Sequence, residues 1–226
     1  MQKNIPMPPA LQEKLNAIDL EVRNLHFKWR FFSQLFTDPN RVKILNATAA
    51  SLFQSVEDSM LSDILLSIMR LTDPSKSMGQ ENLSFDNLVQ EMPNGSLRTE
   101  VANLLSQIKQ KTKGIKTWRD KKLSHNNLQK ALGSFSLPKI QKKDLTDTLG
   151  LIPQIMNLIH RHFTDTEVKY EMCITSQDGD SLLFYLEYGL DAWEEDKQNH
   201  NVDRIHKLRK KHAENKRELP SGVTSR

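Results

Sequence analysis

The chain has 226 residues, of which 37% are hydrophobic and 27% are charged, and its formal net charge is +4. This composition is typical of a soluble protein with one large domain, or one domain with an appendage, that folds without disulfides. The single cysteine, Cys173, excludes an internal disulfide and a multi-cysteine zinc site and fits a reducing cytosol. No apolar run approaches the ~18 residues of a membrane span, and residues 1–6 do not open a signal peptide. We therefore expect a cytoplasmic protein without a membrane segment.

Helical spacing of apolar residues begins directly after Pro8 and Pro9. Apolar residues recur there at alternating steps of four and three, which predicts one long amphipathic helix. The stripe consists of Leu11, Leu15, Ile18, Val22, Leu25, Trp29, Phe32 and Phe36. Asp38 and Pro39 then predict an N-cap with proline at the first helical position, opening a second long helix that ends near Leu71. These two helices should form an antiparallel hairpin, the start of a bundle.

Shorter helices follow, separated by polar, glycine-containing or proline-containing turns. The second helix should bury Val42, Leu45, Ala49, Leu52, Val56, Leu65, Leu66 and Met69. After a polar loop over 72–79, helices are predicted at 82–92, 97–118, from about 124, from beyond Pro138 to about 162, and from Asp180 to about 193. Gly150 and Pro153 should bend or split the helix that follows Pro138. Residues 170–174 fit either a short strand or a loop.

The pattern changes at Lys197. Only three large apolar residues occur before Leu219, and eight Lys/Arg stand between Lys197 and Arg217, which is too little apolar surface for core packing. We therefore predict an all-α, antiparallel helical bundle with an additional C-terminal helix over residues 1–196. Residues 197–226 should form a basic, solvated and partly disordered tail. The pattern is also compatible with a helix in this tail that frays after about Lys216.

Charge is segregated along the chain. Residues 109–143 contain eleven Lys/Arg against one acid, Asp120, a local charge of +10. Residues 144–196 contain twelve acids against Arg161 and Lys169, a local charge of −10. Clustered cations attract phosphates without reading sequence, so the basic segment predicts a surface that binds polyanions. A solvated, lysine-rich helix face is the alternative.

Arg119 and His125 stand six residues apart inside this basic segment. Histidine alone among the side chains present has an ordinary pKa near neutrality, so His125 can take the proton of a ribose 2′-hydroxyl or give one to a leaving oxygen. Arg119 stays charged and can hold a phosphate by two parallel hydrogen bonds, which stabilises the charge that builds as phosphorus is attacked. Because neither role requires a metal or a cofactor, the pair predicts metal-free cleavage of RNA.

On one unbroken helix, Arg119 and His125 would not converge on one phosphate. Six residue steps of about 100° place them roughly 120° apart and about 9 Å along the axis. Either the helix breaks, or a second copy contributes one of the two residues. Ser124 is a candidate N-cap that would put His125 in the first turn of the next helix, where the positive helix end favours a bound phosphate and a neutral imidazole. Both arrangements are compatible with a homodimer whose motifs face each other across a two-fold axis.

The string from Trp118 to His125 has an arginine, a polar residue, four further residues and a histidine, and it resembles the HEPN superfamily of small helical ribonucleases. The resemblance to its abortive-infection, AbiU-type branch covers roughly residues 10–195. The resemblance extends to three short upstream segments, Asp63-Ile64-Leu65, Arg70-Leu71-Thr72-Asp73 and Glu81-Asn82-Leu83-Ser84. The resemblance implies a helical bundle, usually a homodimer, in which Arg119 and His125 of two chains form one cleft that cuts RNA without metal.

The same resemblance implies a toxin or phage-defence effector that an antitoxin or inhibitor protein holds in check. In toxin pairs with a nucleotidyltransferase partner, a tyrosine that receives a nucleotide commonly stands two residues after the histidine. Asn127 occupies that position here, which argues against control by that route.

Further residues are candidates for the same site. Asp120 either holds the arginine or tunes the histidine, or it screens its lysine neighbours as a surface acid. The residues expected to steer or contact RNA are Lys116, Lys121, Lys122 and Asn126. Arg70 and Asp73 either enter the cleft or close the second helix by a salt bridge or cap. Asn82 either orients a phosphate or caps a helix.

The sequence therefore favours a metal-independent endoribonuclease of HEPN type that acts on RNA as a homodimer. Two other classes remain open at this point. A non-catalytic HEPN-like module would bind RNA or nucleotide in the same basic cleft, and a helical interaction protein would pair its first two helices with another chain. An exposed arginine and histidine meeting across a dimer would support the enzyme, whereas a lone exposed histidine would support the binding module.

Overall fold

The computed structural model describes residues 6–118, 142–172 and 175–217. Helices account for almost all of the regular structure in these ranges, which confirms the all-α prediction. The helices are α1 Pro9–Phe36, α2 Pro39–Thr72, α3 Phe85–Glu91, α4 Ser96–Lys111, α5 Lys113–Trp118, α7 Lys142–Thr164, α8 Gly179–Gln198 and α9 Val202–Arg217. Two short strands, β1 Lys76–Ser77 and β2 Gln80–Glu81, pair antiparallel between α2 and α3. None of the described helices is both long and apolar enough to cross a membrane.

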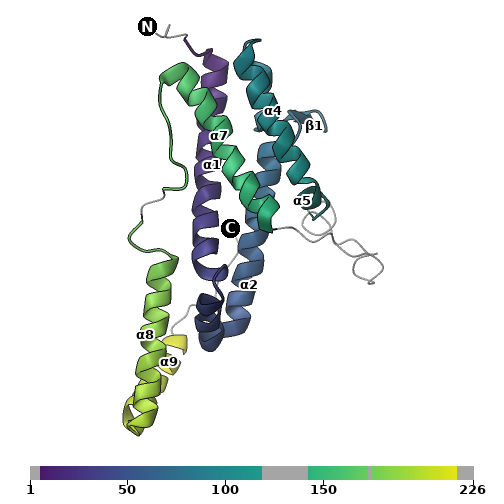
Figure 1. The fold of residues 1–226 in the computed structure, drawn as a ribbon. Helices are drawn as coiled ribbons and strands as arrows, with labels where there is room; N and C mark the ends of the chain where they lie inside the picture. Colours follow the sequence, from purple (N-terminus) through teal and green to yellow (C-terminus); the bar gives the residue numbers. More distant parts are fainter. Residues whose placement is uncertain (1–5, 119–141, 173–174, 218–226) are drawn as a thin grey trace, which may run out of the picture.

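The antiparallel hairpin of α1 and α2 is the centre of the bundle, and α4 and α7 pack beside it (Figure 1). Six residues of the predicted α1 stripe are buried, and the other two, Trp29 and Phe36, pack partly buried against the same core. Asp38 caps α2 as predicted, because its carboxylate accepts a hydrogen bond from the backbone N–H of Asn40 at 2.8 Å. Pro39 occupies the first turn, so the predicted hairpin is confirmed in both its helices and its turn.

Helix α2 is kinked at Ala49, whose φ of −155° and ψ of 65° are not helical. The predicted inner face assumes an unbroken helix, and the kink changes which side of α2 meets the core after that point. Leu52 is 61% exposed instead of buried, so this part of the prediction is wrong. The buried positions of the later part of α2 include Ile64, Leu65 and Ile68, each at most 1% exposed.

Two other helices differ from their predicted course. The helix expected over 97–118 is divided at Thr112, whose φ of −90° and ψ of 5° end α4 and whose hydroxyl donates to the carbonyl of Ile108 at 2.9 Å. By contrast, α7 continues through Gly150 and Pro153 and is not split. The residues near the proline, Ile152 and Ile155, are fully buried, so core packing holds this helix together across the missing backbone donor.

The polar segment after α2 forms a small hairpin instead of an open loop. Asn82 closes it, because its Nδ2 donates to the carbonyl of Pro74 at 2.7 Å and to the Ser77 hydroxyl at 3.0 Å. Ser84 is the N-cap of α3, and its hydroxyl accepts from the backbone N–H of Asn87 at 3.4 Å. The alternative that Asn82 caps this helix is therefore wrong.

Helix α8 is joined to α1 through its own N-cap. The cap is Asp178, two residues before the predicted start of the helix at Asp180, and its carboxylate accepts from the backbone N–H groups of Asp180 at 3.1 Å and Ser181 at 3.3 Å. The same carboxylate accepts from Gln34 at 2.7 Å and from Arg30 at 3.0 Å, both on α1. These hydrogen bonds, of which the one from Gln34 has the largest effect, lower the pKa of Asp178 to about 2.

The predicted solvated tail contains the helix for which the prediction left room, α9, whose side chains over 202–211 are exposed except for half-buried Ile205. Buried Asp196, near the end of α8, accepts hydrogen bonds from Arg204 and from Asn201, each at 3.1 Å. Arg209 of α9 also lies over the Trp193 ring, with its guanidinium carbon 5.8 Å from the ring centroid. α8 and α9 form a second hairpin that projects from one end of the bundle (Figure 1), and α8 extends beyond its predicted end near 193.

A polar cluster ties the segment after α7 to α1. The Tyr170 hydroxyl donates to the Asp19 carboxylate, which also accepts from Arg23 Nε at 2.6 Å. Burial raises the pKa of Asp19, but the hydrogen bonds from Tyr170 and Arg23 outweigh it and the pKa is lowered. His26 lies beside the Tyr170 ring, is 7% exposed, and its Nε2 has no partner among the described residues. Burial therefore lowers the pKa of His26, against the opposing charge of Glu171.

The free energy of unfolding should fall as the pH drops below about 6.5, the usual pKa of histidine. Because the pKa of His26 is lowered in the folded state, the unfolded chain takes up this proton first, and stability present above that pH is lost below it. His26→Phe should remove this part of the pH dependence, since phenylalanine keeps an aromatic ring and does not titrate. Urea unfolding at about pH 7.5 and 5.5 measures the effect, and an equal loss in the variant would contradict the assignment to His26.

Candidate nucleic-acid interface

The residues predicted to cut and bind RNA divide between described and undescribed parts of the chain. Outside the described residues lie Arg119, Asp120, Lys121, Lys122, His125 and Asn126. Within them lie Lys116, Arg70, Asp73 and Asn82. The described chain stops at Trp118, the last residue of α5, and resumes with α7 at Lys142. The surface around the end of α5 therefore directly precedes the motif in the chain.

Lys113 and Lys116 line a hollow where α4 and α5 meet the end of α2. This lysine pocket has a volume of about 240 Å³ and is formed by Met69, Thr72, Asp73, Pro74, Lys109, Thr112, Lys113 and Lys116. Both Lys113 and Lys116 are exposed, and neither forms an ion pair with a described residue. Ammonium groups without acidic partners are available to bind phosphate oxygens.

Three other lysines of the basic segment share two carboxylates, those of Asp86 and Asp147. Lys109 pairs with Asp86 of α3, and Lys111 and Lys143 both pair with Asp147 of α7 at 2.8 Å. The hydrogen bonds from Lys111 and Lys143 lower the pKa of Asp147. The sequence count of +10 therefore overstates the positive charge that a phosphate would meet, because acids outside residues 109–143 lie beside these lysines.

A second hollow adjoins the lysine pocket and shares Asp73 with it. This Glu21 pocket has a volume of about 270 Å³ and is formed by Glu21, Arg70, Leu71, Asp73, Asn82 and Leu83. It brings together three residues singled out from the sequence, Arg70, Asp73 and Asn82. Asp73 ends α2, with its backbone N–H donating to the carbonyl of Arg70 at 3.4 Å. The Arg70 side chain is exposed and forms no ion pair with a described residue, whereas the Asn82 amide is committed to the hairpin.

A family profile of the HEPN group, described as AbiU2, matches residues 8–184. The chain belongs to this AbiU2 family. The match spans both pockets and the string from Trp118 to His125. No curated protein and no solved structure gave a match to the chain. Membership confirms the resemblance seen in the sequence, and it suggests an abortive-infection effector of HEPN type.

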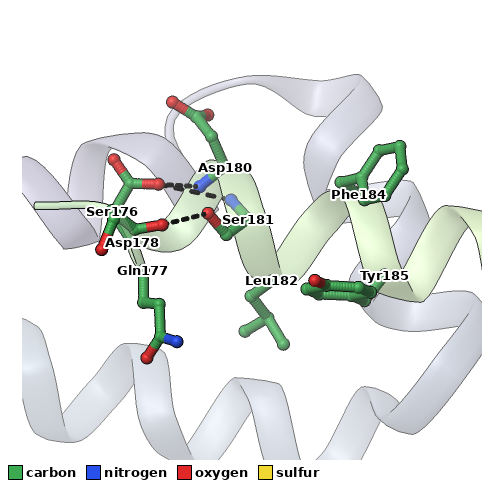
Figure 2. Close-up of a pocket in the computed structure, with 8 residues that line it drawn as sticks. All are labelled: Ser176, Gln177, Asp178, Asp180, Ser181, Leu182, Phe184 and Tyr185. Carbon is green, nitrogen blue, oxygen red and sulfur yellow. Dashed lines mark hydrogen bonds between the residues drawn. The ribbon is translucent and has the colours of Figure 1, made fainter.

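The AbiU2 match ends at Phe184, so most of α8 and all of α9 lie beyond it. A hollow of about 670 Å³ lies at this edge, around the beginning of α8 (Figure 2). Figure 2 shows the Asp178 carboxylate turned toward the backbone N–H groups of Asp180 and Ser181, so a protein carboxylate already occupies the positive end of this helix. Two carboxylates, those of Asp178 and Asp180, would repel a phosphate there. The lysine pocket, where Lys113 and Lys116 outnumber the single carboxylate of Asp73, is better suited to a phosphate.

Sequence reasoning did not single out Glu21 or Lys113. Glu21 is one of several acids on the polar side of α1, and nothing in its spacing marks its place in the same pocket as Arg70. Lys113 is one of eleven cations in the basic segment. Among the described lysines of this segment in the AbiU2 protein, the positions of Asp86 on α3 and Asp147 on α7 separate the paired ones from Lys113 and Lys116.

Proposed function

We propose that this AbiU2 protein is a metal-independent endoribonuclease that acts as an abortive-infection effector. The observation that carries the proposal is the family match over residues 8–184, which includes Arg119 and His125 at their six-residue spacing. The lysine pocket supports it, because Lys113 and Lys116, which form no ion pair with a described residue, lie on the helix that directly precedes Arg119. The proposal is tested by incubating the protein with single-stranded RNA in the presence of a chelator. Cleaved RNA fragments should form with the wild-type protein and not with His125→Ala.

In the proposed reaction, a ribose 2′-oxygen attacks the adjacent phosphorus and the bond to the 5′-oxygen of the next nucleotide breaks. His125 takes the proton of the 2′-hydroxyl or gives one to the leaving 5′-oxygen. Arg119 binds the non-bridging oxygens and stabilises the negative charge of the transition state. Asp120 either holds the Arg119 guanidinium in position or tunes the proton affinity of His125. The products are a 2′,3′-cyclic phosphate and a 5′-hydroxyl.

We propose that the active form is a homodimer. On one helix Arg119 and His125 point in different directions, whereas two copies related by a two-fold axis would bring two histidines and two arginines to one cleft. The arginine of one copy would then act with the histidine of the other, which gives two such pairs in each dimer. An antitoxin or inhibitor protein that holds the effector in check would need to cover this cleft or keep the two copies apart.

The RNA backbone would pass from this cleft over the lysine pocket. Lys121, Lys122 and Asn126 would contact the phosphates next to the cut, and Lys113 and Lys116 those further along. A backbone held only by such contacts is bound without regard to sequence. Any preference for a base must then come from another part of the surface.

Replacing Lys113 and Lys116 together by glutamine should weaken RNA binding and reduce its salt dependence. For single-stranded nucleic acid, each phosphate that a protein neutralises adds about 0.7 to the magnitude of the slope of log K against log salt. Removing two such contacts should therefore reduce the magnitude of this slope by up to about 1.4. Fluorescence anisotropy of a labelled RNA at several salt concentrations measures both quantities.

The matched control is Lys111→Gln with Lys143→Gln, which removes the same charge from the same segment. These two lysines pair with Asp147, so their replacement should leave the salt slope unchanged. Equal slopes for the two double variants would show that the phosphate contact does not depend on the lysine pocket.

A further inference from the structure

The Glu21 pocket is lined by one guanidinium, that of Arg70, and by two carboxylates, those of Glu21 and Asp73. Glu21 and Arg70 both line it, yet neither forms an ion pair or a side-chain hydrogen bond with any residue that the structure describes. Arg70 is exposed and Glu21 is half-buried. The pocket also has an apolar wall, since the Leu83 side chain is 43% exposed. A planar ligand with donors on one side and acceptors on the other could therefore join the Glu21 carboxylate and the guanidinium.

We propose that the Glu21 pocket binds a guanine base of single-stranded RNA, an inference that rests on the proposed ribonuclease function. Guanine presents two adjacent donors, N1–H and the N2 amino group, which match the two oxygens of the Glu21 carboxylate. It presents two acceptors, O6 and N7, which match the forked donors of Arg70. Leu83 would contact the face of the ring.

The other bases satisfy this pair of side chains less well. Adenine has an amino group but no ring N–H beside it, so it offers the carboxylate a single donor group. Uracil has one N–H between two acceptors, and cytosine has one amino group next to an acceptor nitrogen. Each would leave a carboxylate oxygen of Glu21 without a partner in a half-buried place, and an unpaired polar group weakens binding. The pocket therefore selects by hydrogen bonding and not by shape alone.

The size and the place of the pocket fit one base of a bound strand. Its volume of about 270 Å³ lies just below the ~300–1,000 Å³ of pockets that hold drug-sized ligands. It shares Asp73 with the lysine pocket, so a base in the first would lie next to phosphates in the second. Sequence-specific recognition of RNA commonly uses such splayed bases of single strands.

The experiment measures binding of labelled pentanucleotides that cannot be cut because they carry 2′-O-methyl groups. UUGUU should bind the wild-type protein about tenfold more tightly than UUAUU, UUCUU or UUUUU, as expected for one bidentate contact. Glu21→Gln should abolish this preference, because a glutamine amide presents one acceptor oxygen where the carboxylate presents two. Arg70→Lys should also weaken the preference, because lysine keeps the charge but loses the fork.

The control is Glu13→Gln, which removes an exposed acid from the same helix outside the pocket and should keep the preference. Equal binding of all four pentanucleotides, or no binding of any, would overturn the inference. Cleavage is scored separately with unmodified RNA. Cutting without a guanine preference would refute only the base pocket, whereas a guanine preference without cutting would refute the nuclease and retain the base pocket.

Discussion

Replacing His125 by alanine is expected to lower the rate of RNA cleavage by about 10²–10⁴-fold, the usual contribution of one acid–base group. The melting temperature should change little, because the predicted N-cap Ser124 would place His125 in the first turn of a helix, where a side chain contributes little to a core. The rate is measured with a labelled single-stranded RNA in excess chelator. A DNA strand of the same sequence should bind but survive, since it lacks the 2′-hydroxyl that attacks phosphorus.

The matched control for this change is His206→Ala, an exposed histidine on α9. It should leave the cleavage rate unchanged. Cleavage that persists in His125→Ala would remove the histidine from the mechanism, and binding without any cleavage by the wild-type protein would return the chain to the class of binding modules.

Arg119→Ala is expected to lower cleavage by about 10²–10³-fold, comparable to the loss of one preorganised donor to a developing negative charge. Mixing this variant with His125→Ala should restore activity if the site is shared by two copies. Half of the exchanged dimers would be mixed, and each would hold one intact arginine and histidine pair, so about a quarter of the wild-type activity should return.

No recovery after subunit exchange would contradict the shared site. Light scattering that reports a monomer at micromolar concentration would contradict it independently. A monomer that still cuts RNA would require the chain between Trp118 and Lys142 to bring Arg119 and His125 of one copy together.

The helices could be predicted where sequence pattern and local chemistry act over neighbouring residues. The α1 stripe and the Asp38–Pro39 cap need only helical spacing and one side-chain contact, and both are confirmed. The kink at Ala49 has no such local signal, and it exposes Leu52. The attachment of α9 was also missed, because Asp196 and Arg204 stabilise it through a pair of residues on different helices.

The candidate site also has features that could be predicted from the sequence and features that could not. The grouping of Arg70, Asp73 and Asn82 in one pocket agrees with their common selection from the sequence, because the chain turns back at the end of α2. The pairing state of the lysines could not be predicted, since Asp86 and Asp147 are distant in sequence from Lys109 and Lys111. Whether a charge is available to a ligand depends on such distant contacts.

The ends of the RNA fragments that the wild-type protein makes in the presence of a chelator test the proposed chemistry most directly. Attack by a 2′-oxygen needs a base and a phosphate clamp but no metal, so every cut should leave a 2′,3′-cyclic phosphate and a 5′-hydroxyl. Mass spectrometry of the fragments distinguishes this end from a linear phosphate. Fragments that form only when a divalent metal is added, or that carry a 5′-phosphate, would contradict the metal-independent mechanism.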